Sequence, residues 1–211
     1  VSASDASAIN DLLSSAPQIS LINPLSISDT AANLLSQQQA IDDLYHSKNS
    51  SKSFVSKISV QGDVTVDQAQ GNISDPSTGH GLKDWAGIIE SFRIKDTSQK
   101  IYSLSDDSSS DGPSLISKIS LIKATTPITI AEIGTGTTPA TGFLSKGNLL
   151  AKLDSGFEVS DNLSNILIVD KNSPSVPQAL TDLALKGKLR TVSVAVPVTE
   201  LAKIDSLKQA F

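Results

Sequence analysis

Leu25-Ser-Ile-Ser-Asp-Thr30 is the stretch that decides the fold, because the chain writes it three times. The second copy is Phe92-Arg-Ile-Lys-Asp-Thr97 and the third is Phe157-Glu-Val-Ser-Asp-Asn162. The aspartates of the three copies, Asp29, Asp96 and Asp161, recur at intervals of about 66 residues, as expected of supersecondary units that stack on their neighbours. Such repetition makes an enzyme a less favoured interpretation.

A second phrase follows each copy of the first. It reads Val64-Thr-Val-Asp-Gln-Ala69, then Ile128-Thr-Ile-Ala-Glu132, then Val196-Pro-Val-Thr-Glu200. Each repeat therefore divides into two half-units of roughly 28 and 37 residues, each an alternating apolar run followed by a helical apolar pattern. Val1-Ser-Ala-Ser-Asp-Ala6 resembles the second phrase. We predict a single repeat domain over 1–211, made of a half-repeat at 1–24 and repeats at 25–91, 92–156 and 157–211.

The first half-unit shows the expected local structure. Leu25 and Ile27 alternate with polar residues, which predicts a strand. The side-chain oxygens of 28–30 then suit the start of a helix, whose apolar face includes Leu34 and Ile41. Strand, helix and strand in succession favour parallel strands with crossover helices. The predicted fold class is α/β, a repeat solenoid with a parallel sheet. The alternative is a β-rich solenoid or sandwich with short helices.

Composition excludes several classes of function. The chain has 211 residues, a net charge of −5, 38% hydrophobic and 4% aromatic residues, and no cysteine. The missing cysteine excludes disulfides, thiolate metal sites and a cysteine nucleophile. The acidic charge argues against nucleic acid as a partner, because phosphate binding needs a basic surface. No apolar run is long enough to predict insertion into a membrane.

The repeated aspartates are the first candidates for a site. Asp29, Asp96 and Asp161 could form a row of ligands for a cation, or they could be helix N-caps repeated because the fold repeats. We favour caps, because no copy has the clustered oxygen ligands that calcium needs. We therefore assign no catalytic, cofactor-binding or metal-binding residues, and a calcium role has no motif to support it.

Other residues with reactive side chains have ordinary structural interpretations. Thr65 and Thr129 would need a neighbouring base to act as nucleophiles, and neither histidine lies in a repeated position. The acidic pairs 42–43 and 106–107 are expected to be solvated, since adjacent residues do not flank a sugar bond. The loop at 134–138 lacks the lysine of a phosphate-binding loop. Trp85 is expected in the core, because it lies on an apolar helical face.

The segments 25–34, 55–60 and 64–69 together resemble a tandem repeat found in very large secreted bacterial surface proteins. These proteins are similar to type I secreted repeats-in-toxin adhesins. The resemblance covers nearly the whole chain through short, degenerate motifs, and 97–101 and 162–166 depart from it. It implies an extracellular or cell-surface location and supplies no catalytic residues. The calcium-binding glycine nonapeptide of toxin repeats is absent.

These observations together predict a non-enzymatic protein with a structural or adhesive role. It would belong to a bacterial surface, a matrix filament or a surface layer. Its partners would be further copies of itself, assembled head to tail, or other surface components. One alternative is a glycan-binding or ligand-binding module of a secreted protein. A less favoured alternative is a solenoid enzyme that degrades polysaccharide, since the repeated positions carry apolar residues and caps instead of clustered acids.

Overall fold

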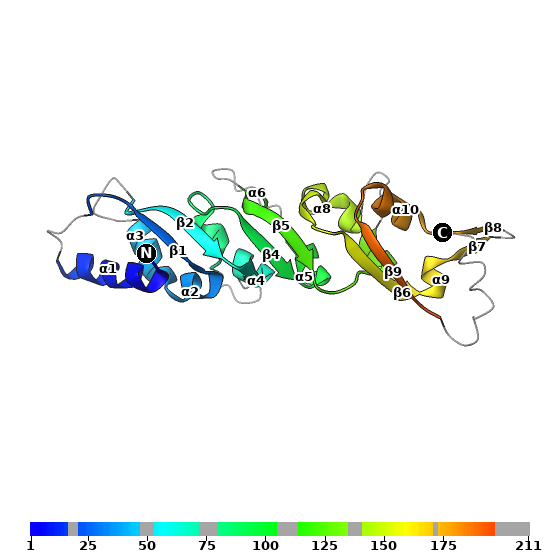
Figure 1. Cartoon of the computed structure of the whole chain (residues 1–211), viewed down its shortest axis with the longest axis horizontal. Helices are drawn as coiled ribbons and strands as arrows, with labels where there is room; N and C mark the ends of the chain where they lie inside the picture. The colour runs from blue at the N-terminus through cyan, green and yellow to red at the C-terminus, as the bar shows by residue number, and fades with distance from the viewer. Residues whose placement is uncertain are drawn as a thin grey trace. The chain divides into compact units, whose positions relative to one another are not determined.

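The chain folds as a mixed α/β protein with small parallel sheets and short helices (Figure 1). A computed structural model describes residues 1–16, 21–46, 53–71, 80–104, 114–134, 141–170 and 173–196. These residues belong to two compact units. The first contains Val1–Lys95 and Leu104–Leu121, and the second contains Asp96–Ser103 and Ile122–Phe211. The predicted loop at 105–112 and the apolar run at 201–211 lie outside the described residues.

The first unit begins with a helix and a two-stranded parallel sheet. Its elements in chain order are α1 (Ala3–Ser15), β1 (Leu25–Thr30), α2 (Ala31–Ser36), α3 (Gln38–Tyr45) and β2 (Val55–Gln61). The strands β1 and β2 lie side by side, with Ile27 opposite Ile58 (Figure 1). The helix α1 packs against α3 and β1, while α3 packs against β2. The helices that connect the two strands are therefore crossover connections, as the sequence predicted.

The rest of the first unit continues the same pattern. It contains β3 (Asp63–Val64), α4 (Val66–Gln70), the 3-10 helix η2 (Leu82–Trp85), β4 (Phe92–Asp96), α6 (Leu115–Lys118) and β5 (Ile119–Ala124). These strands form a sheet in the order β3-β4-β5, and Val64 pairs in parallel with Ile94. Ile58 of β2 makes a further parallel bridge to Ile89. The last residue of β4 and the second half of β5 belong to the second unit.

The second unit holds the remaining elements. They are α5 (Ser98–Tyr102), α7 (Ile130–Ile133), η3 (Gly142–Ser145), α8 (Gly147–Lys152), β6 (Phe157–Asn162), α9 (Leu163–Ile166), β7 (Ile168–Asp170), β8 (Ser173–Ser175), α10 (Gln178–Leu185) and β9 (Leu189–Ala195). The strands β6 and β9 are parallel. The strands β7 and β8 form an antiparallel hairpin. The proline-containing segment 170–177 predicts a loop from its sequence, so this prediction was wrong for the two strands. These two strands are too short to show the alternating pattern that indicates a strand.

The parallel pairs share nearly one sequence separation. In the first unit Ile58 pairs with Ile89. In the second unit Ile128 pairs with Val159, and Val159 in turn pairs with Val192. Each partner lies roughly 31 residues further along the chain. The step across a strand pair is thus nearly constant and close to half a repeat, and it does not alternate between the roughly 28 and 37 residues predicted for the two half-units. Parallel pairing of strands is confirmed, but the continuous parallel sheet of the predicted solenoid is not found. The described strands form four separate sheets of two or three strands, and the sheet of β7 and β8 is antiparallel.

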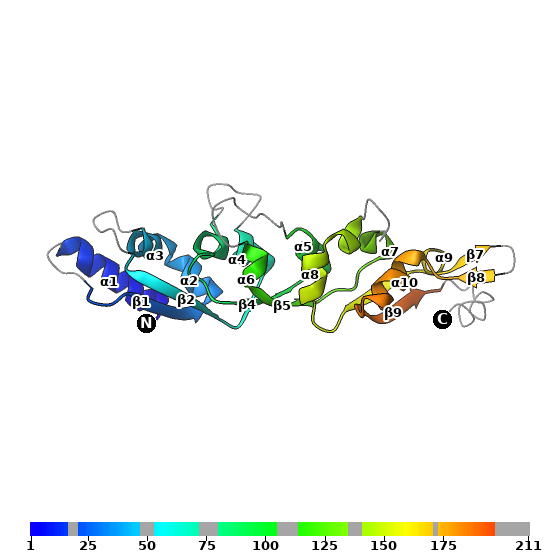
Figure 2. The same cartoon turned by 90° about the horizontal axis from the view of Figure 1, so that it is seen from above.

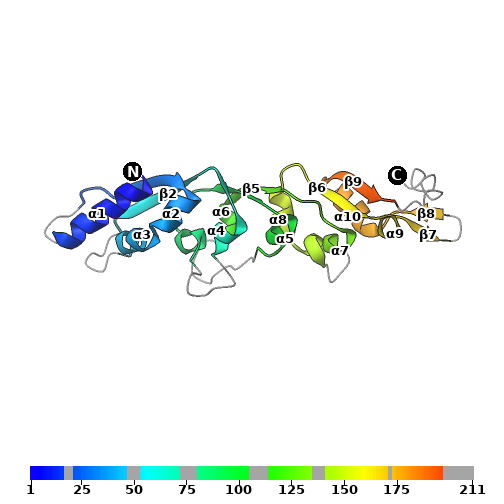
Figure 3. The same ribbon diagram turned by 90° about the horizontal axis from the view of Figure 1, so that it is seen from below.

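The core lies between the strands and the helices of each unit. Figures 2 and 3 show α3 and α4 on one side of β2 and β4, and α7 and α10 on one side of β6 and β9. Side chains of the strands that face the helices are buried, among them Ile27, Ile58, Ile94, Ile122 and Val159. Burial of such a side chain stabilises the fold by about 1.5–3 kcal/mol.

The sequence pattern predicts that Ala179, Leu180, Leu183, Ala184 and Leu185 form the apolar face of a helix, but this face of α10 is only partly buried. Leu180 and Leu183 of α10 are buried, whereas the side chain of Leu185 is 80% exposed. Successive helical residues are about 100° apart, so Leu185 lies on the far side of α10 from Leu183. The prediction that all the apolar residues of this helix form one face was therefore wrong.

Candidate functional site

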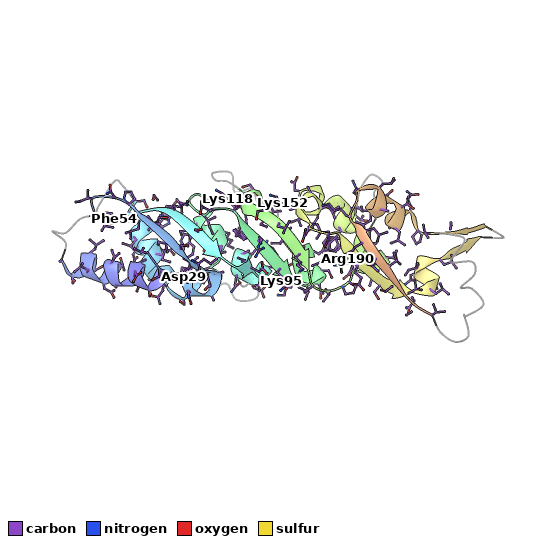
Figure 4. The ribbon with its side chains drawn as sticks, in the orientation of Figure 1. Asp29, Phe54, Lys95, Lys118, Lys152 and Arg190 are labelled. Carbon is purple, nitrogen blue, oxygen red and sulfur yellow. The ribbon has the colours of Figure 1, made fainter. Side chains whose placement is uncertain are left out.

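The repeated aspartates lie at the ends of β1, β4 and β6, immediately before a helix (Figure 4 labels Asp29). The N-cap residues of these helices are Thr30, Thr97 and Asn162. The Thr30 hydroxyl accepts a hydrogen bond from the Asn33 amide at 3.3 Å. The predicted cap is thus displaced by one residue, because each aspartate still belongs to its strand and the next residue makes the turn into the helix.

One oxygen of the aspartate binds the helix that follows it. Asp29 Oδ1 accepts hydrogen bonds from the Thr30 amide at 2.8 Å and from Asn33 Nδ2 at 2.7 Å. Asp161 Oδ1 makes the same two contacts, with the Asn162 amide and with Asn165 Nδ2, both at 2.8 Å. Asp96 Oδ1 accepts from the Thr97 amide at 2.7 Å. This oxygen fixes the strand-to-helix turn within its own half-unit.

The other oxygen binds the start of an earlier helix. Asp29 Oδ2 accepts a hydrogen bond from the Ala3 amide at 3.1 Å, and Asp161 Oδ2 accepts from the Ile130 amide at 2.9 Å. Ala3 and Ile130 are the first residues of α1 and α7, which belong to the preceding half-units. Amides in the first turn of a helix have no partner within the helix. Each of these two carboxylates therefore connects two successive half-units.

Hydrogen bonding keeps these carboxylates ionised. The bond from Asn33, followed by the bonds from the Ala3 and Thr30 amides, lowers the pKa of Asp29. Partial burial raises the pKa of Asp161, but the bonds from Asn165 and from two backbone amides outweigh it and lower the pKa overall. A carboxylate whose oxygens accept several backbone bonds is a stable anion. Its chemical task here is to hold helix starts in place.

The second phrase provides the N-caps of the helices α1, α4 and α7. Thr65 and Thr129 cap α4 and α7, and Ser2 caps α1 in the same way. In each case the residue three positions later completes a capping box, for example Glu132, whose Oε2 accepts from the Thr129 amide at 2.7 Å. The Thr65 and Thr129 hydroxyls accept bonds from the Gln68 and Glu132 amides, so they serve as structural caps.

Among the residues that the structure describes, three ion pairs join neighbouring strand segments on the exposed side of the sheets. They are Lys57–Glu90 at 2.6 Å, Asp63–Arg93 at 3.0 Å and Glu158–Arg190 at 3.3 Å (Figure 4 labels Arg190). The two partners of each pair again lie one half-unit apart in the sequence. Exposed ion pairs contribute about 0–1 kcal/mol each, so they favour the register more than they stabilise the fold.

The acidic pair 42–43 differs from the expectation. Asp42 is half-buried, and its Oδ1 accepts a hydrogen bond of 2.6 Å from Nε1 of Trp85. Trp85 is fully buried, as predicted. Asp43 is exposed, but the prediction of a solvated side chain was wrong for Asp42, because the buried indole N–H needs an acceptor. The pair 106–107 lies outside the described residues.

Neither histidine takes part in the repeated arrangement. His46 follows the last residue of α3, with its ring 4.5 Å from that of Tyr45. His80 is exposed, and its Nδ1 lies 3.2 Å from Oδ2 of Asp84. Over the described residues, no three histidine or acidic side chains are grouped so that they could hold a metal ion.

Paired glycines bring together the backbone at the two ends of two segments, a contact that sequence analysis did not predict. In the first unit a Cβ on Gly81 would lie 2.3 Å from the backbone nitrogen of Gly71. In the second unit a Cβ on Gly142 would lie 2.5 Å from the Ile133 carbonyl oxygen, and one on Gly134 would lie 2.2 Å from the Thr141 carbonyl oxygen. The backbone entering and leaving each segment is thus in direct contact. The sequence signal was a glycine just after each second-phrase helix, followed by another glycine a short way along the chain.

Comparison with known proteins gives no match, whether with family models, curated proteins or solved structures. The helices in the described part of the chain are all too short or too polar to cross a membrane. The site is therefore interpreted from its own geometry. That geometry is a repeated set of carboxylates and hydroxyls bound to backbone amides at the junctions of half-units.

Proposed function

We propose that this chain is a non-enzymatic structural repeat protein, whose strand–helix half-units stack as a solenoid. One observation carries the proposal: the parallel pairs β1–β2, β3–β4 and β6–β9 all join residues roughly 31 positions apart. A nearly constant sequence separation between paired residues means that each half-unit packs against the next in the same way. Stacking of this kind adds length through identical neighbour contacts.

The repeated carboxylates support a structural role. Asp29 and Asp161 each bind amides of two successive half-units, and the threonines of the second phrase bind their own helices. A catalytic carboxylate would instead point an oxygen toward a bound substrate. The repeated aspartates Asp29 and Asp161 thus serve the junctions between half-units, and the repeated threonines serve the starts of their own helices.

The described residues give little support to the two alternative functions, a glycan-binding or ligand-binding module and a polysaccharide-degrading enzyme. Glycan-binding surfaces commonly use exposed aromatic rings. Trp85, Phe92, Phe143 and Phe157 are buried, whereas Tyr102 is 39% exposed. A polysaccharide-degrading enzyme would need two carboxyl groups facing one another across a sugar. The resemblance to secreted surface repeats favours an extracellular location, with further copies or other surface components as partners.

Small-angle X-ray scattering of the monomeric chain tests the proposal. A compact globule of 211 residues would have a radius of gyration of about 17 Å. A stack of half-units predicts a clearly larger value and a rod-like cross-section. A value near that of the globule would contradict it. Binding of the monomer to a glycan array would favour the ligand-binding alternative, and release of sugars from a polysaccharide would favour the enzyme.

A further inference from the structure

In the first unit, the residues on either side of the segment 72–80 are in direct contact. A Cβ on Gly81 would lie 2.3 Å from the backbone nitrogen of Gly71 and 2.6 Å from the carbonyl carbon of Gln70. Adding one bond of about 1.5 Å at each end of the shorter distance places the Cα atoms of Gly71 and Gly81 at most about 5.3 Å apart. The four residues of a β-turn span less than about 7 Å. Two residues would therefore be enough to connect Gly71 to Gly81.

The second unit has the same arrangement around the segment 135–140. A Cβ on Gly134 would lie 2.3 Å from the carbonyl carbon of Thr141, and one on Gly142 would lie 2.6 Å from the Cα atom of Gly134. The Cα atoms of Gly134 and Gly142 are thus no more than about 4.1 Å apart, close to the roughly 3.8 Å that separates adjacent residues. The chain again reaches nearly the same point before and after the segment.

Contacts outside the two segments hold each pair of ends together. In the first unit α4 packs against η2, and both helices bury side chains, among them Ala69 and Trp85. In the second unit α7 packs against η3, and Ile133 and Phe143 of these helices are buried. These contacts involve no residue of either segment. The position of each pair of ends is therefore fixed by the elements on either side.

The two closures occupy equivalent places in the repeat. Gly71 and Gly134 each end the helix that a capping box of the second phrase begins, and a 3-10 helix follows both segments. Their φ angles are +82° and +78°, a conformation that glycine adopts without the steric cost of a Cβ. The fold thus makes the same provision for a closed segment in both units.

We propose that the glycine closures make 72–80 and 135–140 dispensable to the fold, so that each repeat accepts a segment of variable length and sequence at this point. Stability resides in the elements on either side, which the closure joins directly. Insertions into successive repeats of a repeat protein commonly lie at equivalent points. The inference does not depend on stacking of the half-units into a rod, because each closure lies within one unit.

Shortened variants test the inference. Asn-Gly, which suits a two-residue turn, replaces 72–80 in one variant and 135–140 in another, and Gly-Asn-Gly-Ser replaces each segment in a second pair. Thermal unfolding should give midpoints that are within about 3 °C of the wild type or higher, since a shorter loop costs less entropy to close. A larger decrease in both variants of either unit would overturn the inference.

A lengthened variant adds the matched comparison. The same flexible insertion of about 12 Gly and Ser residues is placed within 135–140 or directly after Gly187. Gly187 is also a glycine of positive φ, but an added Cβ there would meet nothing within 4 Å, and the next amide donates to the Leu183 carbonyl oxygen at 3.0 Å. The insertion after Gly187 separates α10 from β9 without a closure, so it should lower the midpoint, whereas the other should not. A loss from the insertion within 135–140 that equals or exceeds the loss after Gly187 would overturn the inference.

Discussion

A single carboxylate serves two half-units in this protein. Asp29 and Asp161 each accept amide bonds from the helix that follows and from the first residue of an earlier helix. Their side chains are short and acceptor-only, which suits a position where several N–H groups converge. The same residue type therefore recurs where the geometry of the strand-to-helix turn calls for such an acceptor.

Acid should weaken the fold through these two residues. The pKa of each is lower in the folded chain than its ordinary value, so each contributes stability above the unfolded pKa of about 4. This contribution is lost as the pH falls through the lowered folded pKa. We expect Asp29→Asn and Asp161→Asn to reduce the urea midpoint at pH 7, with a difference from wild type that shrinks toward pH 3.

The matched control for this experiment is Asp11→Asn on the exposed side of α1. It should leave the urea midpoint near the wild-type value at both pH values. A difference between wild type and Asp29→Asn that stays constant from pH 7 to pH 3 would show that the carboxylate charge contributes nothing.

At the residue scale, the sequence predicted where the repeated aspartates lie but did not predict the groups that they bind. The threefold spacing correctly placed the aspartates where helices begin. The cap itself is the following residue, and the bond to an earlier helix depends on residues in the preceding half-unit. Periodicity describes neighbours along the chain, so such a contact could not be predicted. Asp42 shows the same limit, because its partner Trp85 lies far away in the sequence.

The helices of the half-units depend on their caps and on packing. Most of them have one or two turns, and isolated helices of that length are not stable in water. The helix α7 spans only Ile130–Ile133 and begins with the capping box of Thr129 and Glu132. Its stability must come from the cap and from contacts with β6 and η3.

Removal of that cap should therefore destabilise the second unit. We expect Thr129→Ala to lower the free energy of unfolding by about 1 kcal/mol, because the first-turn amide loses its acceptor. Thr129→Ser keeps the hydroxyl and should remain close to wild type. Chemical denaturation followed by circular dichroism measures both. Equal losses in the two variants would assign the effect to the threonine methyl group.

The glycine pairs give a second prediction at this scale. Gly142 has a φ of +59°, and an added Cβ would overlap the Ile133 carbonyl oxygen. We expect Gly142→Ala to cost about 1–3 kcal/mol, since the backbone itself would have to move. The control is Gly147→Ala, which meets no atom within 4 Å at the start of α8. Thermal unfolding should show a lower midpoint for the first variant alone, and equal midpoints would contradict the close approach.

Element prediction succeeded where the apolar pattern was long enough. The strands at 25–30, 157–162 and 189–195 and the helix at 178–185 lie in regions where the pattern predicted such elements. The hairpin of β7 and β8 was missed because its strands are too short to alternate visibly. The predicted apolar face of α10 was too wide, because it included Leu185, whose side chain is exposed.

At the scale of the whole molecule, the step between paired strands links sequence to architecture. The sequence repeats about every 66 residues and the strands pair roughly 31 residues apart, so one repeat contains two steps. The pattern predicted parallel strands, because each is followed by a helix before the next begins. It could not predict which strand edges remain open, since that depends on the partner of every strand. The exposed position of Ile22 became visible only in the structure.

The most direct test of this account is a nuclear Overhauser experiment on the isotopically labelled chain. The account predicts that Ile58 contacts Ile27 on one side and Ile89 on the other, in a parallel amide-to-Hα pattern. In the second unit it predicts that Val159 contacts Ile128 and Val192 in the same way. Antiparallel Hα-to-Hα contacts between these strands would contradict the account, as would direct pairing of the strands that carry Asp29, Asp96 and Asp161.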